Sequence, residues 1–332
     1  MNTETRNSNF ELLRIIAMIF IVIWHISVHA QRGEPPSHDY VSAITTTGVN
    51  LFVLISGYFG IKLKWENLLN ILSIVIFYYV AQFIAEIFIF KITPTAGHFI
   101  NIIAPISRSP WWFMTCYIVL TLISPGLNII KNNATDKQYK LIVATLVFLS
   151  CFSGFIFTNE FTNPDGYNLF HFVTLYFIGD AIKRFEIAQR FKTYQFYGMY
   201  FVSTIALFAY IILISKNIKY NNPFLMVAAV SFFCIFSKVK LKSKKINAIA
   251  TFMLPIYLLQ DSPFGFKTYK YLYSKGYEFN FTGWEYYQTL ATYIFVLFAS
   301  TFILEITRRF IFNKPISCLS NLLKSKVSIF DE

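Results

Sequence analysis

Residues 10–30 read FELLRIIAMIFIVIWHISVHA, which is the composition of a helix that crosses a membrane. The stretch nevertheless contains Glu11, Arg14, His25 and His29. Ionisable side chains are costly in hydrocarbon, and those that occur in membrane spans face other helices or a water-filled path. The stretch therefore predicts a first membrane span that also carries functional groups.

The whole chain has the composition of a membrane protein. Of its 332 residues, 55% are hydrophobic and 14% are charged, and aromatic residues make up 19%. A soluble protein of this length needs more charge, whereas aromatic residues concentrate at membrane–water interfaces. The net charge of +12 fits basic residues that orient a membrane protein, so we expect no nucleic-acid partner. The composition predicts an all-α, polytopic integral membrane protein.

Hydrophobic segments along the chain predict about ten transmembrane helices joined by short loops. With the N-terminus placed in the cytoplasm, the inner segments hold more than twice as many Lys and Arg residues as the outer segments. The positive-inside rule thus predicts that both termini are cytoplasmic. We expect one membrane domain over residues 1–332, with spans in 10–312 and a cytoplasmic tail at 313–332. The predicted spans are residues 10–30, 43–61, 67–90, 112–130, 139–157, 168–182, 196–215, 222–237, 246–264 and 287–312.

Helix geometry relates the polar residues of the first span to one another. Arg14 and His25 are separated by nearly three turns, so both are expected on one face, about 16 Å apart along the axis. Glu11 is placed to pair with Arg14, and His29 adjoins the same face. These positions predict a polar stripe from the inner surface towards the outer one. Taken alone, Arg14 also reads as a snorkelling cation, and His25 as a histidine hydrogen-bonded between packed helices.

Small residues mark the second predicted span, which contains TTTGVNLFVLISGYFG at residues 45–60. Gly48, Gly57 and Gly60 are expected to let neighbouring helices approach closely. Ser56 reads either as a hydrogen-bonding group between helices or as a group that contacts substrate.

Other ionisable residues lie near the ends of predicted spans. Arg108 and Trp112 stand at the predicted outer mouth, and Asp261 lies near the outer end of the ninth span, where a carboxylate can orient a histidine. Asp180 and Glu305 lie near the basic inner rim and are expected to form ion pairs there.

The outer loop at residues 265–286 is crowded with Tyr, Phe and Trp. It reads either as part of an interfacial aromatic belt or as a platform on which sugar rings stack. Among the histidines, only His25 and His29 have the i, i+4 spacing of metal ligands, and we expect no metal.

Two motifs near the N-terminus resemble the membrane-bound acyltransferase family 3. Residues 9–25, NFELLRIIAMIFIVIWH, resemble the family's first span, in which an arginine, ten residues and a histidine follow one another. Arg14 and His25 occupy the matching positions. Residues 48–60, GVNLFVLISGYFG, resemble the family's second-span signature.

Two later motifs extend the resemblance over nearly the whole chain. Residues 109–128, SPWWFMTCYIVLTLISPGLN, are similar to the family's Trp-containing fourth span. Residues 252–263, FMLPIYLLQDSP, resemble a late-span motif that usually ends in Tyr-Leu-Ile-His-Asp. Tyr257 and Asp261 fit this motif, whereas Gln260 takes the place of the histidine. Any role that the family gives to that second histidine therefore does not transfer to this chain.

The resemblance implies transfer of an acyl group, most often acetyl, from cytoplasmic acyl-CoA to a hydroxyl of a surface polysaccharide or its lipid-linked precursor. His25 would act as general base or become transiently acylated, and Arg14 would hold a phosphate or a pantetheine carbonyl. Acetyl-CoA would be the donor, membrane lipid would surround the chain, and the bacterial cytoplasmic membrane would be its location. Ser56, Arg108, Trp112 and Asp261 are expected to contact the acceptor.

A transporter or flippase for a lipid-linked sugar or an amphipathic solute is the alternative function. It would also explain polar groups inside the membrane. Such proteins favour internal repeats with paired broken helices, and no repeat of this kind is clear in the sequence. The resemblance and the concentration of polar groups in the first span favour the acyltransferase.

Overall fold

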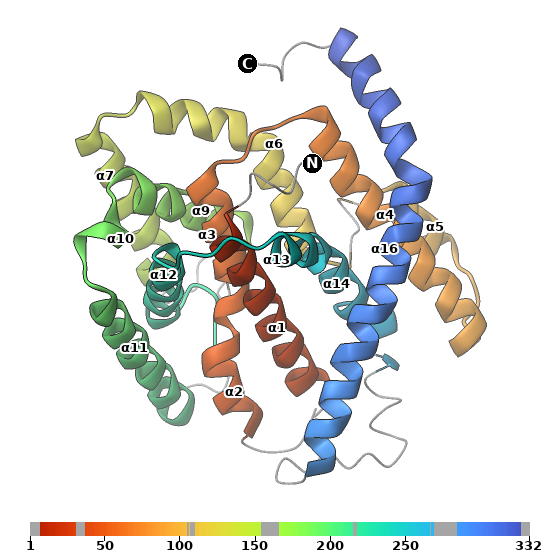
Figure 1. Cartoon of the computed structure of the whole chain (residues 1–332), viewed down its shortest axis with the longest axis horizontal. Coiled ribbons are helices and arrows are strands. Elements are labelled where there is room, and N and C mark those ends of the chain that lie inside the picture. Colours follow the sequence, from red (N-terminus) through yellow and green to blue (C-terminus); the bar gives the residue numbers. More distant parts are fainter. Residues whose placement is uncertain are drawn as a thin grey trace. The chain divides into compact units, whose positions relative to one another are not determined.

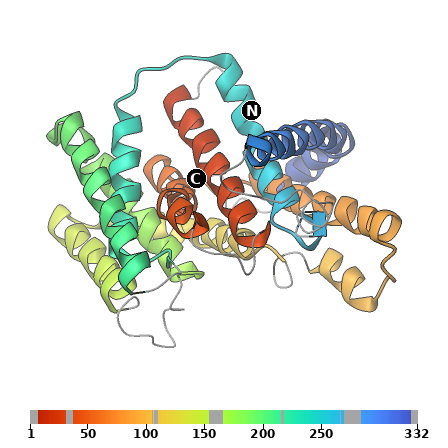
Figure 2. The same ribbon diagram turned by 90° about the horizontal axis from the view of Figure 1, so that it is seen from below.

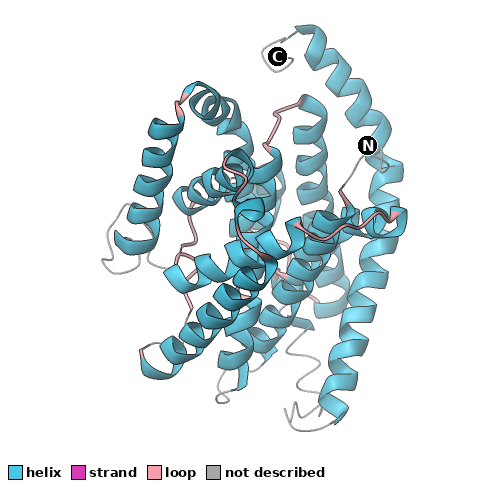
Figure 3. Cartoon of the chain, turned by 60° about the vertical axis from the view of Figure 1, so that its left-hand side comes forward, coloured by secondary structure: helices cyan, strands magenta, loops and turns pink. Residues whose placement is uncertain are grey.

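The computed structural model describes residues 7–30, 37–104, 106, 110–153, 166–214, 218–265, 267–268 and 284–326. These residues are mostly helical and contain no strand, as Figure 3 shows. The predicted all-α class is therefore confirmed for the described part of the chain. The main elements are α1 (Ser8–Ala30), α2 (Ser37–Thr45), α3 (Thr47–Phe59), α4 (Trp65–Phe90), α5 (Ala96–Ile103), α6 (Trp112–Asn133), α7 (Asp136–Val147), η2 (Phe148–Ser153), α9 (Leu169–Arg184), α10 (Ile187–Arg190), α11 (Thr193–Leu213), α12 (Pro223–Ser237), α13 (Lys244–Ile249), η3 (Ala250–Phe252), α14 (Met253–Gln260) and α16 (Trp284–Lys326).

Polar side chains start several of these helices by capping backbone N–H groups. Thr135 accepts from the N–H of Gln138 before α7, and Asn168 accepts from the N–H of His171 at the start of α9. Asn222 does the same before α12, whose first residue is a proline that has no N–H to satisfy. The caps place these helix starts where the sequence changes from polar to apolar.

The chain divides into two compact units, each made from two separate stretches. Unit 1 comprises Met1–Ile61 and Ile123–Met253, and unit 2 comprises Lys62–Leu122 and Leu254–Glu332. In unit 1, α3 packs against α1, α9 and α12, and α11 and α12 run side by side (Figures 1 and 2). In unit 2, α4 packs against α16 (Figure 1).

Glycines let α3 pack closely against its neighbours in unit 1. A Cβ added to Gly57 would lie 2.2 Å from the carbonyl oxygen of Tyr176, and one added to Gly179 would lie 2.3 Å from that of Leu54. Because both atoms are backbone, neither can move aside easily. A Cβ on Gly48 would lie 2.6 Å from a carbonyl oxygen of α1. The predicted close approach is thus confirmed at Gly48 and Gly57. At Gly60 no atom lies within 4 Å, and this residue instead adopts a φ of +75° at the end of α3.

Five of the described helices are long and apolar enough to cross a membrane. They are Ser8–Ile26, Val41–Phe59, Trp65–Phe90, Trp112–Asn133 and Thr193–Leu213. These coincide with the first, second, third, fourth and seventh predicted spans. A multi-pass membrane protein is therefore supported, while the count of ten and the cytoplasmic placement of both termini stay predictions.

Two predicted spans are less regular than the sequence indicated. The second turns at Thr46 between α2 and α3, and the ninth is divided into α13, η3 and α14. At the first break, Thr45, Thr46 and Thr47 each donate a hydroxyl hydrogen bond to a carbonyl of the preceding turn. Such bonds satisfy the backbone locally, so an apolar segment can bend without leaving carbonyls unpaired.

The last helix is longer than the predicted span. α16 has 43 residues and continues to Lys326, although the span was expected to end at residue 312. At 1.5 Å per residue it is about 64 Å long, which exceeds the roughly 30 Å of a hydrocarbon core. The predicted tail is thus helical through Lys326, even though Pro315 lies within the helix.

We predict that Gly57→Ala and Gly179→Ala each destabilise unit 1, because the new methyl group would meet a backbone carbonyl at less than van der Waals distance. Overpacking of this kind costs about 1–3 kcal/mol. Thermal unfolding of the purified protein in detergent would measure it. Gly198→Ala in α11 is the matched control, since no atom lies within 4 Å of its added Cβ. An equal melting temperature for Gly57→Ala and Gly198→Ala would contradict the packing argument.

Candidate functional site

The start of α1 is tied to another part of unit 1 by side-chain hydrogen bonds. Asn9 Nδ2 donates to the carbonyl of Phe236 at 2.9 Å, and Ser8 Oγ accepts from the N–H of Ser243 at 2.9 Å. The helix end that carries Arg14 is thus held against the end of α12 and the segment that follows it.

Arg14 is paired within its own helix, as the sequence predicted. Its Nη1 lies 2.7 Å from Oε1 of Glu11. The Glu11 side chain is 6% exposed, whereas that of Arg14 is 30% exposed. The buried carboxylate fixes one edge of the guanidinium, and the exposed fraction leaves part of it open to an anionic ligand.

His25 lies near the other end of α1 and is buried. Its ring contacts that of Trp24, with centroids 5.0 Å apart and the planes inclined by 65°. Since α1 is continuous from Ser8 to Ala30, the helix geometry expected for Arg14 and His25 is present, with about 16 Å between them along the axis.

The predicted stripe is apolar in its middle part. Met18 and Ile21 lie within about 40° of the Arg14–His25 face, and both are buried. Polar groups therefore occupy the two ends of this face, and apolar packing joins them. The predicted stripe thus consists of two polar ends, and whether it serves as a path for a ligand stays a prediction.

The remaining predicted site residues lie on several different elements. Ser56 of α3 is half-buried and donates to the carbonyl of Phe52 in its own helix at 3.1 Å. Trp112 is half-buried at the start of α6, and Asp261 is buried directly after α14. Arg108, the His29 side chain and most of the aromatic loop lie outside the described residues.

The late-span motif in unit 2 is held by Trp111, whereas the sequence pointed to its neighbour Trp112 as the functional residue. Trp111 is fully buried, and its Nε1 donates to the carbonyl of Leu258 at 3.1 Å. Gln82 Nε2 of α4 donates to the same carbonyl at 3.0 Å. Two side chains from different segments thus fix the end of α14. A tryptophan in the run SPWW was visible in the sequence, but which of the pair faces inward depends on the helix start.

The end of this motif is shaped by a proline. Pro263 has no N–H, so the carbonyl of Leu259 lacks its helical donor. Ser262 Oγ donates to that carbonyl at 3.2 Å and accepts from the N–H of Gly265 at 2.9 Å. Gln260 and Asp261 immediately precede this turn and are buried. The motif therefore forms an ordered segment in which Gln260 occupies the place of the family's histidine.

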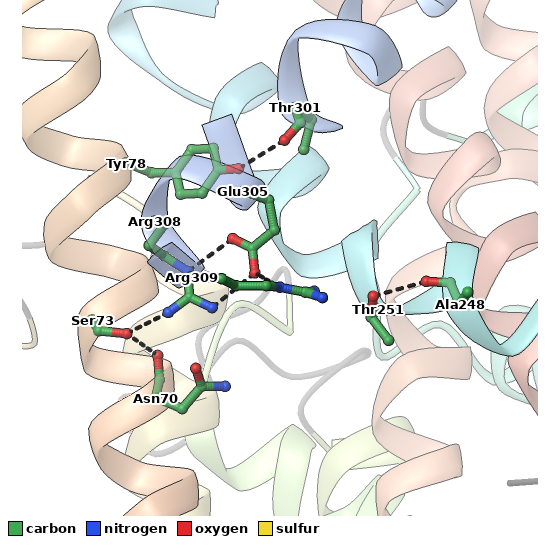
Figure 4. Close-up of polar contacts among 9 residues, drawn as sticks. All are labelled: Asn70, Ser73, Tyr78, Ala248, Thr251, Thr301, Glu305, Arg308 and Arg309. Carbon is green, nitrogen blue, oxygen red and sulfur yellow. Dashed lines mark hydrogen bonds and ion pairs between the residues drawn. The ribbon is translucent and has the colours of Figure 1, made fainter. Parts of the chain in front are cut away.

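The predicted ion pairs at the ends of other helices are confirmed. In unit 2, Glu305 of α16 accepts from Nε and Nη2 of Arg308 at 2.8 Å each, and from Nε of Arg309 at 2.7 Å (Figure 4). Arg308 Nη1 also donates to Ser73 of α4 at 2.7 Å. The side chains of Glu305 and Arg308 are 1% and 2% exposed, so this pair is buried.

Unit 1 has its own ion pair, between Asp180 of α9 and Lys131 of α6. Lys131 Nζ lies 2.9 Å from Oδ1 of Asp180, and Tyr139 Oη donates to Oδ2 at 2.7 Å. Arg184 donates to the carbonyl of Lys131 in the last turn of α6 and to that of Ala134 just after this helix. These bonds join three helices at one end of the unit.

Among the described residues, no three His, Cys, Asp or Glu side chains gather as metal ligands would. Unit 1 offers instead a buried imidazole and a partly open guanidinium on one helix, and unit 2 by itself contains the ordered late-span segment. These are the features of a multi-pass membrane protein with polar groups inside its helices.

Comparison with protein families identifies the family. The model of the acyltransferase 3 domain, described as an acyltransferase domain, matches residues 7–307. The chain therefore belongs to acyltransferase family 3, a family of membrane acyltransferases, and the match runs through both units. No significant match was found among curated proteins or among solved structures.

We predict that Glu305→Gln destabilises the protein, because it leaves Arg308 buried without its counter-charge. Breaking a buried ion pair costs about 3–5 kcal/mol. Thermal unfolding in detergent would measure the loss, with Glu66→Gln on the exposed face of α4 as control. The double variant Glu305→Gln/Arg308→Met should regain part of the stability. If the double variant unfolds below the single one, the stranded charge is not the cause.

Proposed function

We propose that this protein is an integral-membrane O-acyltransferase that moves an acetyl group from cytoplasmic acetyl-CoA to a hydroxyl of a cell-surface polysaccharide or its lipid-linked precursor. The bacterial cytoplasmic membrane is its proposed location. One observation carries the proposal: a partly open Arg14 and a buried His25 lie on one continuous helix of a chain that belongs to acyltransferase family 3.

Arg14 is proposed to bind the donor. Acyl-CoA carries phosphates and amide carbonyls, and a guanidinium held by a carboxylate is a preorganised donor for either. Glu11 holds one edge of Arg14, which reduces the entropy that donor binding would otherwise cost. A phosphate bound at Arg14 leaves about 16 Å of helix between it and His25, a distance that the extended pantetheine arm has to span.

His25 is proposed to act at the reacting end of the donor. The acceptor oxygen attacks the thioester carbonyl, His25 takes the proton of the acceptor hydroxyl, and the CoA thiolate leaves and is protonated. Transient acylation of the imidazole is the other route by which the same residue would serve. Burial of His25 excludes water, which would otherwise compete with the acceptor for the acyl group.

The late-span segment is proposed to contribute to the acceptor side. Asp261 and Trp112 were predicted to contact the acceptor, and Ser56 and Arg108 complete the residues assigned to it. The bonds from Trp111 and Gln82 to Leu258 hold Asp261 in a defined place. Gln260 supplies an amide where the family motif has a histidine, so position 260 cannot take the proton-transfer role of that histidine.

We predict that His25→Ala lowers acetyl transfer about 10²–10⁴-fold, which is the usual contribution of a general base. Membrane vesicles would be given labelled acetyl-CoA, and acetylation of the surface glycan would be measured. His25→Gln, which keeps a polar side chain of similar size, should be as inactive. Both variants must be present in the membrane at wild-type level. Unchanged transfer by either variant would refute the catalytic assignment.

For Arg14 we predict a weaker binding of acetyl-CoA rather than a slower chemical step. Replacing Arg14 alone would strand the buried Glu11, so Glu11→Gln is compared with Glu11→Gln/Arg14→Gln. The double variant should raise the KM for acetyl-CoA at least about tenfold, the value of one charge-assisted hydrogen bond. kcat should change much less. An equal KM in the two variants would exclude a role for Arg14 in donor binding.

A further inference from the structure

Unit 1 contains a buried row of three neutral polar side chains that the proposed transfer does not use. Asn50 of α3, Ser150 of η2 and His171 of α9 are 0%, 2% and 1% exposed. Ser150 Oγ lies 3.1 Å from Nδ1 of His171, and Nε2 of His171 lies 3.2 Å from Oδ1 of Asn50. A hydroxyl next to an imidazole that a third side chain orients is the arrangement by which enzymes activate a nucleophile.

The neighbours of Asn50 determine where the protons lie. Asn50 Nδ2 donates to the carbonyl of Tyr220 at 3.0 Å, so the other amide atom, Oδ1, faces His171. Because Oδ1 only accepts, Nε2 of neutral His171 must carry the ring proton. Nδ1 then presents a lone pair, and the Ser150 hydroxyl donates to it. The imidazole is thus the tautomer that can accept the proton of Ser150.

Two asparagines beside this row carry unpaired polar atoms. Asn221 Nδ2 donates to the carbonyl of Ser150 at 3.0 Å, but its Oδ1 has no hydrogen bond within the described part of the chain. Asn222 caps α12 through Oδ1, and its Nδ2 likewise finds no acceptor there. Both side chains are at most 1% exposed. Buried amide groups left unpaired cost free energy, so they point to a ligand that pairs with them.

The backbone at Ser150 is also unusual. Phe148–Ser153 is a π-helix, the only one among the described residues, and π-helical turns occur frequently at functional sites. Phe148 and Phe152 of this turn are 60% and 48% exposed. Ser150 therefore faces inward from a helix whose other side borders the surface.

The close contact between α3 and α9 determines which residues of the two helices face each other in this row. Gly57 meets Tyr176, and Asn50 meets His171, so the two helices run parallel. Asn50 precedes Gly57 by about two turns and therefore lies on the same face of α3. The close glycine contact thus brings the amide of Asn50 to the imidazole.

We infer that Ser150 is a nucleophile that takes the acyl group as an oxygen ester, with His171 as its general base and Asn50 as a positioning residue. The inference rests on the proposed acetyl transfer and replaces the direct attack of the acceptor on the thioester by two steps that pass through Ser150. Ser150 Oγ bonds to the thioester carbon, the C–S bond breaks, and the hydroxyl proton passes through His171 to the departing thiolate. The products are acetyl-Ser150 and CoA with a free thiol.

The second step regenerates Ser150. An acceptor hydroxyl attacks the ester carbon, the bond to Ser150 Oγ breaks, and the acceptor's proton returns to that oxygen. No oxidant, reductant or further reactant is required.

The test uses the full chain in membranes, labelled acetyl-CoA and no acceptor, followed by denaturation and peptide mapping. Wild type should carry acetyl on Ser150 as an ester that resists neutral hydroxylamine. Ser150→Ala should carry none, and His171→Gln should acquire the label at least about 100-fold more slowly. Ser150→Cys should carry a thioester at the same position that neutral hydroxylamine cleaves. Ser231→Ala, at another buried serine of unit 1, should be labelled like wild type.

A second labelling experiment uses a fluorophosphonate, which reacts with activated serines. Its outcome distinguishes a failure of this inference from a failure of the proposed function. If wild type transfers acetyl but neither reagent marks Ser150, the inference is overturned and the proposed function stands. Acetyl found on Cys151 or His25 instead of Ser150 also overturns it. If wild type transfers no acetyl but the fluorophosphonate marks Ser150, the proposed function fails, and Ser150 remains the nucleophile of another ester-forming reaction.

Discussion

The structure depends on one constraint: a polar group inside an apolar helix has to find its partner within the protein, because hydrocarbon offers none. The constraint applies to the backbone wherever a helix is interrupted. At Pro263 the hydroxyl of Ser262 replaces the missing donor, and at the end of α14 Trp111 and Gln82 share the carbonyl of Leu258. In the π-helix, Asn221 Nδ2 donates a hydrogen bond to the carbonyl of Ser150. Interrupted helices are therefore tied to specific side chains, and those side chains fix neighbouring functional groups.

The features that could be predicted from the sequence are those set within one helix. Regular spacing along α1 is enough to place Arg14 and His25 on one face and to pair Arg14 with Glu11. The small residues of the second predicted span likewise predicted that helices pack closely at Gly57. The ion pairs of Asp180 and Glu305 followed from a general rule, since a carboxylate next to basic residues in an apolar setting finds one of them.

What could not be predicted depends on how helices are rotated against one another. The buried row of Asn50, Ser150 and His171 joins three segments far apart in the sequence, and each residue alone reads as an ordinary packing group. Trp111 and Trp112 are adjacent and chemically identical, so only the start of α6 decides which is buried. The turn at Thr46 could not be predicted for another reason. The threonine hydroxyls that satisfy the backbone there do not interrupt the hydrophobic pattern of the sequence.

Unit 1 separates charged from neutral polar groups along its helices. Phe10 of α1 contacts Tyr58 near the end of α3, and α3 runs parallel to α9, so Arg14 and Glu11 lie towards the same end of the unit as Asp180. His25 lies towards the other end, and the neutral row of Asn50, Ser150 and His171 lies between the two, because Gly48, two residues before Asn50, meets Ala17 and Ile21 of α1. A charge needs a counter-ion and some access to water, whereas amides, hydroxyls and a neutral imidazole are satisfied by hydrogen bonds alone.

This separation matches the two halves of the proposed donor. The phosphates of CoA are anionic and suit the end where Arg14 is partly open, while the acetyl group is uncharged and suits a site that excludes water. A charged group near the acyl carbon would have to be desolvated with it, at a cost that hydrogen-bonded neutral groups avoid. The physical requirement for burying polar groups in unit 1 thus also favours an arrangement in which the phosphates of the donor are bound at the charged end and its acyl group is transferred among the neutral groups further along the helices.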